Sequence, residues 1–179
     1  NRNHDAVFGK VVSGRNHGDV TDLVGLFINT VPVRVRTDND TTVVDALQAL
    51  QQQASDTTQH DYCALSEIQQ LSELGNDLFQ SNITFENYEG SDGLWEMAKK
   101  VGVTVLQADE VNYSELNLTV SSGEDGQLLV SFTYDGRLYS SDTIGHVKAL
   151  FLHLLEEMAE NADRKISELS LLDEKSKEQ

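Results

Sequence analysis

The sequence predicts an α/β or α+β domain in which helices flank a mixed β-sheet. Three observations lead to this fold class. Over residues 31–36 valines alternate with other residue types, which is the period of a half-buried strand. Apolar residues recur at helical spacing over 43–59 and 140–161. Two more alternating runs, 116–120 and 128–132, are joined by a Gly-rich loop, so they should pair as an antiparallel hairpin, and both helices should pack on the resulting sheet.

Composition limits the classes of partner. The 179 residues include 13 Lys and Arg against 30 Asp and Glu, a formal net charge of −17. A surface of this sign repels phosphate groups, so neither nucleic acid nor an anionic membrane is an expected partner. No apolar run approaches the ~18–20 residues of a membrane span. Cys63 is the single cysteine, which leaves no disulfide framework and no thiolate metal cluster. The expected compartment is the cytoplasm.

The stretch 24–35, V-G-L-F-I-N-T-V-P-V-R-V, is a dense apolar run with Asn29 and Thr30 at its centre. Polar side chains inside such a run must find hydrogen-bond partners or they cost free energy. Either the stretch turns a core strand around a hydrogen-bonded corner, or it places Asn29 in a cavity. Pro32 has no N–H to donate, so it should occupy the first turn of its strand or an edge strand.

The flanking segments give the remaining elements. Residues 6–12 predict a short buried strand that ends just before Arg15, in a loop rich in Gly, Ser and Asn. An arginine at the end of a buried strand often pairs with a carboxylate from another segment. Residues 38–42 offer several N-caps for the first helix, and 140–142 cap the last one.

No complete catalytic or metal-binding constellation is present. His60 and Asp61 are adjacent, and adjacent residues on a helix point apart, so they do not form a dyad. Cys63 lies three residues from His60, but buried free cysteines are common and nothing nearby indicates an activated thiol. His153 and Glu157 are one helical turn apart without a third ligand in view, so we interpret them as a surface pair.

Two further interpretations concern strand-like segments. Residues 78–85 and 101–107 each predict a strand, and Trp95 and Met97 between them are expected to pack rather than line a pocket. Three Asn-x-Ser/Thr triplets begin at Asn82, Asn112 and Asn117. We interpret them as accidental sequons, because all three lie in or beside strand-like segments and nothing else indicates secretion.

Several segments, in this order, resemble the condensation domains of nonribosomal peptide synthetases. The run F-G-K-V-V-S-G-R, which ends at Arg15, is similar to the family's strand leading into Ser-Gly-Arg. The stretch 24–34 resembles the family's fifth core motif almost residue for residue. Residues 60–69 resemble the sixth-motif region, with Ala64 where the family often has proline. Residues 79–88, ending F-E-N-Y, resemble the next strand, and I-S-E-L-S-L-L-D-E near the end of the chain resembles the linker into an adenylation domain.

This resemblance implies a chloramphenicol-acetyltransferase-like lobe, with a mixed sheet flanked by helices. Residues 1–163 would form the C-terminal, acceptor-side lobe of a condensation domain, and 164–179 the linker. Asn29 and Thr30 would line the substrate tunnel between two lobes. Arg15 would lie at the lobe junction and pair with an aspartate of the other lobe. The implied partners are the N-terminal lobe, upstream and downstream carrier domains and an adenylation domain. No cofactor or metal would bind directly, because the substrates arrive on the phosphopantetheine of carrier domains.

The family's catalytic motif, His-His-x-x-x-Asp-Gly, does not occur in these 179 residues. In the family this motif belongs to the N-terminal lobe, so the resemblance implies a fragment that is inactive alone. A noncatalytic condensation-like module, which binds carrier domains or recruits a partner enzyme, is the alternative. An epimerisation domain is disfavoured by I-N-T at 28–30, and a free-standing trimeric acyltransferase by the linker-like end of the chain.

Overall fold

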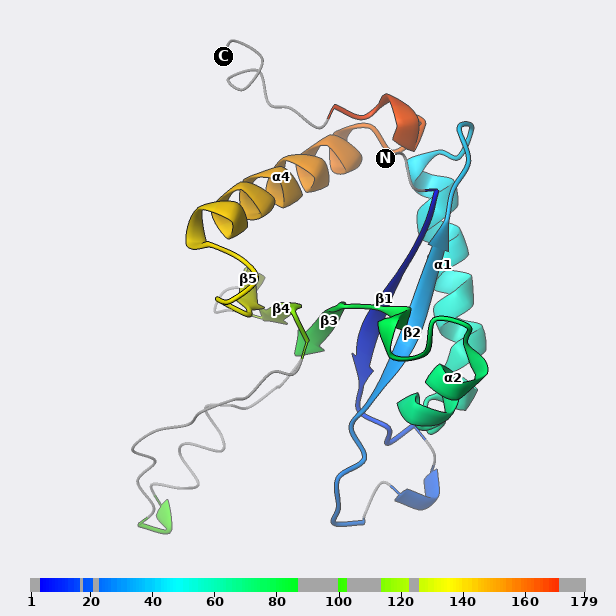
Figure 1. The fold of residues 1–179 in the computed structure, drawn as a ribbon, viewed down its shortest axis with the longest axis vertical. Helices are drawn as coiled ribbons and strands as arrows, with labels where there is room; N and C mark the ends of the chain where they lie inside the picture. Colours follow the sequence, from blue (N-terminus) through cyan, green and yellow to red (C-terminus); the bar gives the residue numbers. More distant parts are fainter. Residues whose placement is uncertain are drawn as a thin grey trace.

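The computed structural model describes residues 4–16, 18–20, 23–86, 100–102, 114–122 and 126–170. In these residues five strands form one mixed sheet in the order β2-β1-β3-β4-β5 (Figure 1). The pairs β1–β2 and β4–β5 are antiparallel, whereas β1–β3 and β3–β4 are parallel. The predicted mixed sheet is therefore confirmed, with strands β1 Asp5–Val12, β2 Asn29–Arg36, β3 Ser81–Glu86, β4 Leu116–Ser122 and β5 Leu128–Tyr134.

The predicted hairpin is β4 followed by β5. Leu116 pairs with Tyr134 and Ser122 with Leu128, in antiparallel register. Pro32 lies in β2, which is an edge strand of the sheet, as its missing donor predicts. Trp95, Met97 and most of the strand predicted at 101–107 lie outside the described residues.

Three α-helices accompany the sheet in the described part of the chain: α1 Val43–Thr57, α2 Leu65–Leu71 and α4 Ser141–Glu160. The first begins with a capping box, in which the Thr42 side chain accepts from the Asp45 N–H and the Asp45 carboxylate accepts from the Thr42 N–H. Ser140 caps α4 by accepting from the Thr143 N–H. Short 3-10 turns lie between these elements at η1 Gly18–Val20, η2 Thr58–His60 and η3 Gly75–Leu78, and η5 Ile166–Glu168 follows α4.

Both long helices contact the sheet, as predicted. The ring of Phe151 in α4 meets Phe132 in β5 edge to face, with centroids 5.8 Å apart. At the other edge, the Gln53 side chain of α1 donates to the Arg34 carbonyl of β2 at 3.0 Å. Figure 1 accordingly shows α1 alongside β1 and β2, and α4 near β4 and β5.

The segment after α4 packs against the N-terminus of α1 and accepts hydrogen bonds from its first N–H groups. The N–H groups of Val43 and Val44 donate to the carbonyls of Arg164 and Ala162, and the Val43 side chain is fully buried. Lys165 Nζ lies 2.6 Å from the Asp40 carboxylate. Part of the range predicted as a linker thus packs on α1. The linker assignment of 164–179 stays a prediction, and residues 171–179 lie outside the described part.

The two faces of the sheet differ in chemistry. Side chains alternate along a strand, so the register places every second residue of neighbouring strands on one face. One face is mostly apolar, and its members Val12 and Val31 are only 8% and 7% exposed. We call it the apolar face; it includes Val12, Val31, Ile83, Leu118 and Phe132. The opposite, polar face includes Thr30, Asn82, Thr84, Asn117 and Thr119.

Candidate functional site

A groove of about 630 Å³ lies on the polar face of the sheet. We call it the polar groove. Its volume is in the range of small-molecule sites. Carboxylates of Asp77, Glu86 and Glu115 are among its lining groups, and none of the described lining residues is a lysine, arginine or histidine. Its floor is formed by Thr30, Asn82, Thr84, Asn117 and Thr119.

Asn117 is the most deeply buried polar residue of this floor, at 4% exposed. Its Nδ2 donates to Thr119 Oγ1 at 3.0 Å, and its Oδ1 accepts from Thr84 Oγ1 at 3.4 Å. These bonds offset the desolvation of the amide, which would otherwise be costly in the middle of a sheet. The hydrogen bonds also fix the orientations of three polar side chains on the floor.

Asn82 lies beside Asn117 but is not satisfied in the same way. Its Oδ1 is buried and has no hydrogen-bond partner among the described residues. The side chain lies over Gly9, where an added Cβ would overlap Asn82 Oδ1 and come within 2.6 Å of the Phe79 ring and 2.8 Å of the Thr30 methyl. A glycine in β1 therefore makes the room that the Asn82 amide occupies.

Asn29 and Thr30, the two predicted tunnel residues, are adjacent in β2 and so point to opposite faces. Thr30 lines the polar groove. Asn29 points to the other side, where its Nδ2 donates to the carbonyls of Asp61 at 2.8 Å and Cys63 at 2.7 Å. These contacts make Asn29 a hydrogen-bonded corner between β2 and the turn before α2. Its role in a substrate tunnel stays a prediction.

Arg15 organises the loop between β1 and β2. Its guanidinium donates to the carbonyls of Val20, Leu23 and Gly25 at 2.9–3.1 Å. The same group stacks on the Phe27 ring, 4.6 Å from the ring centroid. Its partnership with a carboxylate across a lobe junction stays a prediction.

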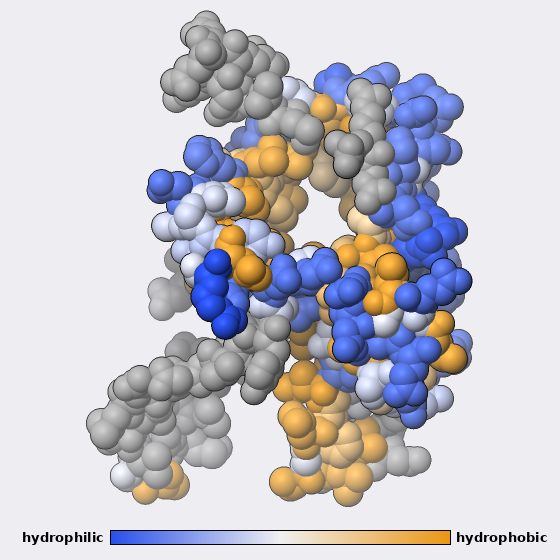
Figure 2. Space-filling model, viewed as in Figure 1, coloured by the Kyte–Doolittle hydropathy of each residue, from blue (hydrophilic) through white to orange (hydrophobic). Residues whose placement is uncertain are grey.

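Gly14 explains the tight entry into this loop. It has φ +65°, and an added Cβ would overlap the Phe27 carbonyl oxygen, so only glycine fits without strain. The loop nevertheless presents apolar side chains to solvent, and Figure 2 shows hydrophobic residues gathered at this end of the molecule. Those more than half exposed are Leu23, Val24, Leu26 and Ile28.

Asp61 is a buried acid that the sequence did not reveal. It is 3% exposed, and its Oδ2 accepts from Asn16 Nδ2 at 3.0 Å. Together with the Asn29 bond to its carbonyl, this contact joins the β1–β2 loop, the start of β2 and the turn before α2. One feature of the sequence could have indicated this contact: Asn16 follows the Ser-Gly-Arg run, and Asp61 lies in the segment similar to the sixth motif, so both partners belong to segments that resemble the family.

The polar groove itself was also missed. Its signal was the triplet N-x-T, which occurs in both β3 and β4 at 82–84 and 117–119. We interpreted these triplets as accidental sequons. In the structure they lie side by side in two parallel strands, where Asn pairs with Asn and Thr with Thr. Period-two alternation then places all four side chains on one face.

A basic corner lies on the polar face at the β1–β2 edge. Arg34 Nη2 lies 2.6 Å from Asp5 Oδ2, and Arg36 Nε lies 3.3 Å from the same oxygen. Hydrogen bonding from Arg34 is the main reason that the pKa of Asp5 falls from 3.8 to about 2. These cations are thus occupied by Asp5, and they do not line the polar groove.

The described residues hold neither a metal cluster nor a membrane span. No group of three or more His, Cys, Asp or Glu side chains in this part of the chain could hold a metal ion. None of its helices is both long and apolar enough to cross a bilayer.

The family comparison and the sequence comparison find related proteins of one kind. The family model described as condensation domain matches residues 1–179. Bacitracin synthase 3 of Bacillus licheniformis is 36% identical over 97% of the chain, and tyrocidine synthase 3 of Brevibacillus parabrevis is 31% identical over 98%. Surfactin synthase subunit 3 of Bacillus subtilis is 31% identical over 97%. The chain spans only 3% of the length of each of the first two relatives and 14% of the third.

Solved structures share the fold at lower identity. A four-domain nonribosomal peptide synthetase bound to AMP and glycine has a TM-score of 0.75, with 20% identity over 96% of this chain and 14% of that one. The starter condensation domain of rhizomide synthetase gives 0.74 with 18% identity, over 96% and 41%. The X-domain in complex with OxyB from teicoplanin biosynthesis gives 0.73 with 18% identity, over 96% and 39%. The predicted chloramphenicol-acetyltransferase-like fold is confirmed.

Proposed function

The chain belongs to the condensation-domain family, and from this premise we propose that it is the C-terminal, acceptor-side lobe of a nonribosomal peptide synthetase condensation domain. The family match over residues 1–179 carries the proposal. The chain also corresponds to 41% of the starter condensation domain of rhizomide synthetase, and it contains no His-His-x-x-x-Asp-Gly. Both observations fit one lobe of a two-lobed domain.

The reaction of the whole domain would be amide formation. The nitrogen of an acceptor aminoacyl thioester attacks the carbonyl of a donor peptidyl or aminoacyl thioester. A C–N bond forms, the C–S bond of the donor breaks, the amine loses a proton and the donor carrier regains its thiol. A lobe without the histidine motif would contribute binding, orientation and exclusion of water, which can lower the barrier substantially when two substrates must be held together.

The polar groove is the part of this chain that we assign to substrate. It offers hydroxyl and amide groups on a rigid sheet, and such preorganised dipoles suit the polar thioester and amide groups of carrier-bound substrates. In this proposal Thr30 lines the tunnel directly. Asn29 holds the neighbouring turn and borders the tunnel, while Arg15 orders the β1–β2 loop at the lobe junction and pairs with an aspartate of the other lobe.

The proposed partners follow from the same reading. They are the N-terminal lobe, the upstream and downstream carrier domains with their phosphopantetheine arms, and an adenylation domain after residue 179. No cofactor would bind to the lobe itself. The proposed compartment is the cytoplasm.

A direct test mixes the chain with one donor-loaded and one acceptor-loaded carrier domain. The chain alone should give no dipeptide above background, because the proton-handling histidines are absent and half a tunnel positions nothing. Addition of an N-terminal lobe carrying the histidine motif should restore product, and a version with that motif changed to alanines serves as the control. Turnover by the isolated chain would refute the assignment.

A noncatalytic module is a second candidate, because one structural neighbour is an X-domain in complex with another protein, OxyB. In that case the chain would recruit a partner or bind carrier domains without forming a bond. The sequence upstream of Asn1 separates the two functions. An intact histidine motif there supports catalysis, and its loss supports recruitment.

A further inference from the structure

Part of the polar groove is lined by segments that are far apart in the chain. Ile28 is the last residue of the β1–β2 loop, and Thr30 is in β2. Leu65 and Gln69 are one turn apart on α2, so they lie on the same side of that helix. The width of the groove between loop and helix therefore depends on the contacts that join these segments.

Within the described residues, three hydrogen bonds connect the β1–β2 loop, the start of β2 and the turn before α2. Asn29 donates to the carbonyls of Asp61 and Cys63 at 2.8 and 2.7 Å, and Asn16 Nδ2 donates to Asp61 Oδ2 at 3.0 Å. We call these four residues the Asp61 network. Asn29 is the first residue of β2, and α2 begins two residues after Cys63. The network thus lies where both elements begin.

Asp61 is the only member of this network with a charged side chain. The residue is 3% exposed, and a buried carboxylate is costly unless it is hydrogen-bonded. Its donor, Asn16, is exposed and lies 45 residues earlier in the chain. A charged acceptor forms a stronger hydrogen bond than a neutral one. The carboxylate is therefore well suited to hold a distant loop in place.

We propose that Asp61 is a positioning residue for the condensation reaction. Its contact with Asn16 holds the β1–β2 loop against the turn before α2, and so sets the spacing between Ile28 and Leu65 across the groove. This inference rests on the proposed function, which assigns the polar groove to substrate. Asp61 is not among the described lining residues, so it acts through those that are. A displacement of about 1 Å in such walls can lower a rate about a hundredfold.

An exchange of the two side chains is the main test. Asn16→Asp alone places two carboxylates together and should break the contact, because like charges repel. Adding Asp61→Asn reverses the bond, with an amide at position 61 donating to a carboxylate at position 16. The single-turnover condensation rate of the reassembled domain, per folded molecule, should fall at least about tenfold in Asn16→Asp. It should return to within about threefold of the parent in the double variant. No recovery would overturn the proposal.

Substitutions at Asp61 alone separate orientation from carrier affinity. Asp61→Ala removes the acceptor and should lower the maximal rate at least about tenfold. The acceptor-carrier concentration at half-maximal rate should change by less than about twofold, because orientation and not carrier affinity is lost. Asp61→Asn keeps an acceptor oxygen and should lose less than about threefold. Equal rates per folded molecule for the parent and Asp61→Ala would contradict the positioning role.

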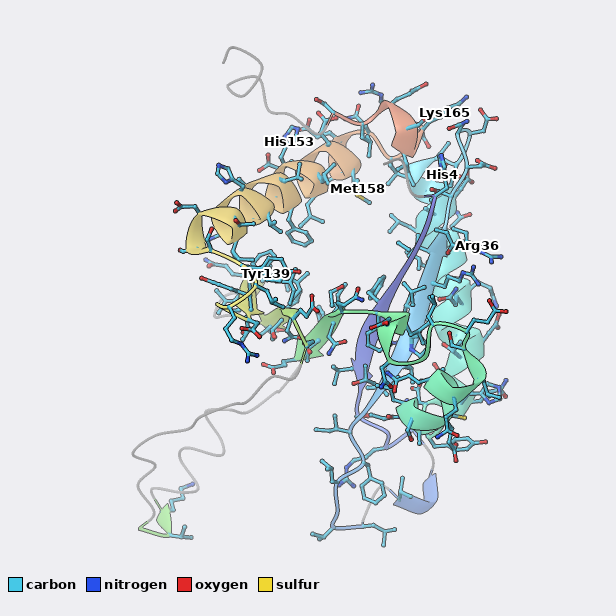
Figure 3. The ribbon with its side chains drawn as sticks, viewed as in Figure 1. His4, Arg36, Tyr139, His153, Met158 and Lys165 are labelled. Carbon is cyan, nitrogen blue, oxygen red and sulfur yellow. The ribbon has the colours of Figure 1, made fainter. Side chains whose placement is uncertain are left out.

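Thr42→Ala is the control for a general loss of stability. It removes the side-chain cap of α1 and should lower the urea midpoint. Thr42 forms a β-bridge with Lys165, which Figure 3 shows near the end of α1 that is remote from α2. The condensation rate per folded molecule should stay unchanged. If Thr42→Ala lowers this rate as much as Asp61→Ala does, loss of stability explains the effect and the proposal is wrong.

Amide hydrogen exchange on the 179-residue chain keeps this inference separate from the proposed function. Asp61→Ala should speed exchange in 61–71 and at the start of β2 at least about tenfold, and leave α4 unchanged, because the opening is local. Exchange equal to that of the parent would overturn the inference even where dipeptide forms. If the reassembled parent domain forms no dipeptide, the proposed function fails, and the exchange measurement then decides whether Asp61 positions the loop.

Discussion

The two faces of one sheet have the same strands, the same register and opposite chemistry. On the apolar face Phe132 meets Phe151 of α4, and Val31 is nearly inaccessible to solvent. On the polar face Thr30, Asn82 and Asn117 line a groove that the described residues leave open. The difference lies in what the side chains contact: on the apolar face Phe132 packs against α4, whereas on the polar face hydroxyl and amide groups line the groove.

Asn29 shows that polar side chains are not confined to the polar face. It lies on the same side of β2 as Val31, and there its amide donates to two backbone carbonyls. Thr30, one residue later, lies on the groove side. Neighbouring polar residues of one motif therefore have different contacts, and substitutions at each position can test them separately.

The largest expected effect is the difference in stability between two variants that place the same charge on opposite faces of β2. Val31→Asp would bury an unpaired carboxylate at a site that is 7% exposed, and should cost about 3–5 kcal/mol of unfolding free energy. Thr30→Asp places the same carboxylate in the open groove and should change stability by no more than about 1 kcal/mol. Urea unfolding of both variants is the measurement. Equal losses would show that the faces are not distinct.

The next effect tests the room that Gly9 provides on the polar face. Gly9→Ala places a methyl group against Asn82, Phe79 and Thr30, and should cost about 1–3 kcal/mol. Gly9→Ala combined with Asn82→Ala should recover part of this loss, which a double-mutant cycle measures.

Gly145→Ala in α4 is the control, because nothing lies within 4 Å of its added Cβ. It should stabilise the helix by about 0.5–1 kcal/mol. Additive losses in the cycle would contradict the packing account.

A smaller effect separates Asn29 from Thr30. Asn29→Ala leaves the Asp61 and Cys63 carbonyls without their donor and should cost about 1–3 kcal/mol. Thr30→Val keeps the branched shape and should stay within about 1 kcal/mol of the parent, while lowering the condensation rate of the reassembled domain. Thermal unfolding and single-turnover condensation are measured for each variant. A rate per folded molecule that falls for Asn29→Ala as well would support its predicted role at the tunnel.

The sequence predicted the elements better than it predicted the site. Helices, hairpin and edge proline follow from local periodicity, capping and the missing donor of Pro32, all of which act within a few residues. The polar groove could not be found in this way, because it depends on which strands become neighbours. Asn82 and Asn117 are 35 positions apart in the chain and pair only in the parallel β3–β4 ladder.

The buried acid Asp61 was missed for a related reason. Its partner Asn16 lies 45 residues earlier, and nothing local distinguishes a buried aspartate from an exposed one. The resemblance to a family indicated Arg15, Asn29 and Thr30 as site residues, but it did not indicate which groups each of them contacts. Of these, the structure places Thr30 in the polar groove and gives Arg15 and Asn29 backbone carbonyls as partners.

The smallest expected effect concerns the basic corner of the polar face, where Asp5 binds Arg34. The pKa of Asp5 is lowered from 3.8 to about 2 in the folded chain, so its ionised form favours folding above pH 4. This contribution should fade as the pH falls from about 4 to 2, because the carboxylate is then protonated in both states. The pair is exposed, so screening by salt keeps the effect small. Asp5→Asn and Arg34→Gln should each flatten the loss of stability across that pH window, measured as urea midpoints against pH. If Asp5→Asn flattens the curve and Arg34→Gln does not, the Arg34 bond is not the cause of the lowered pKa.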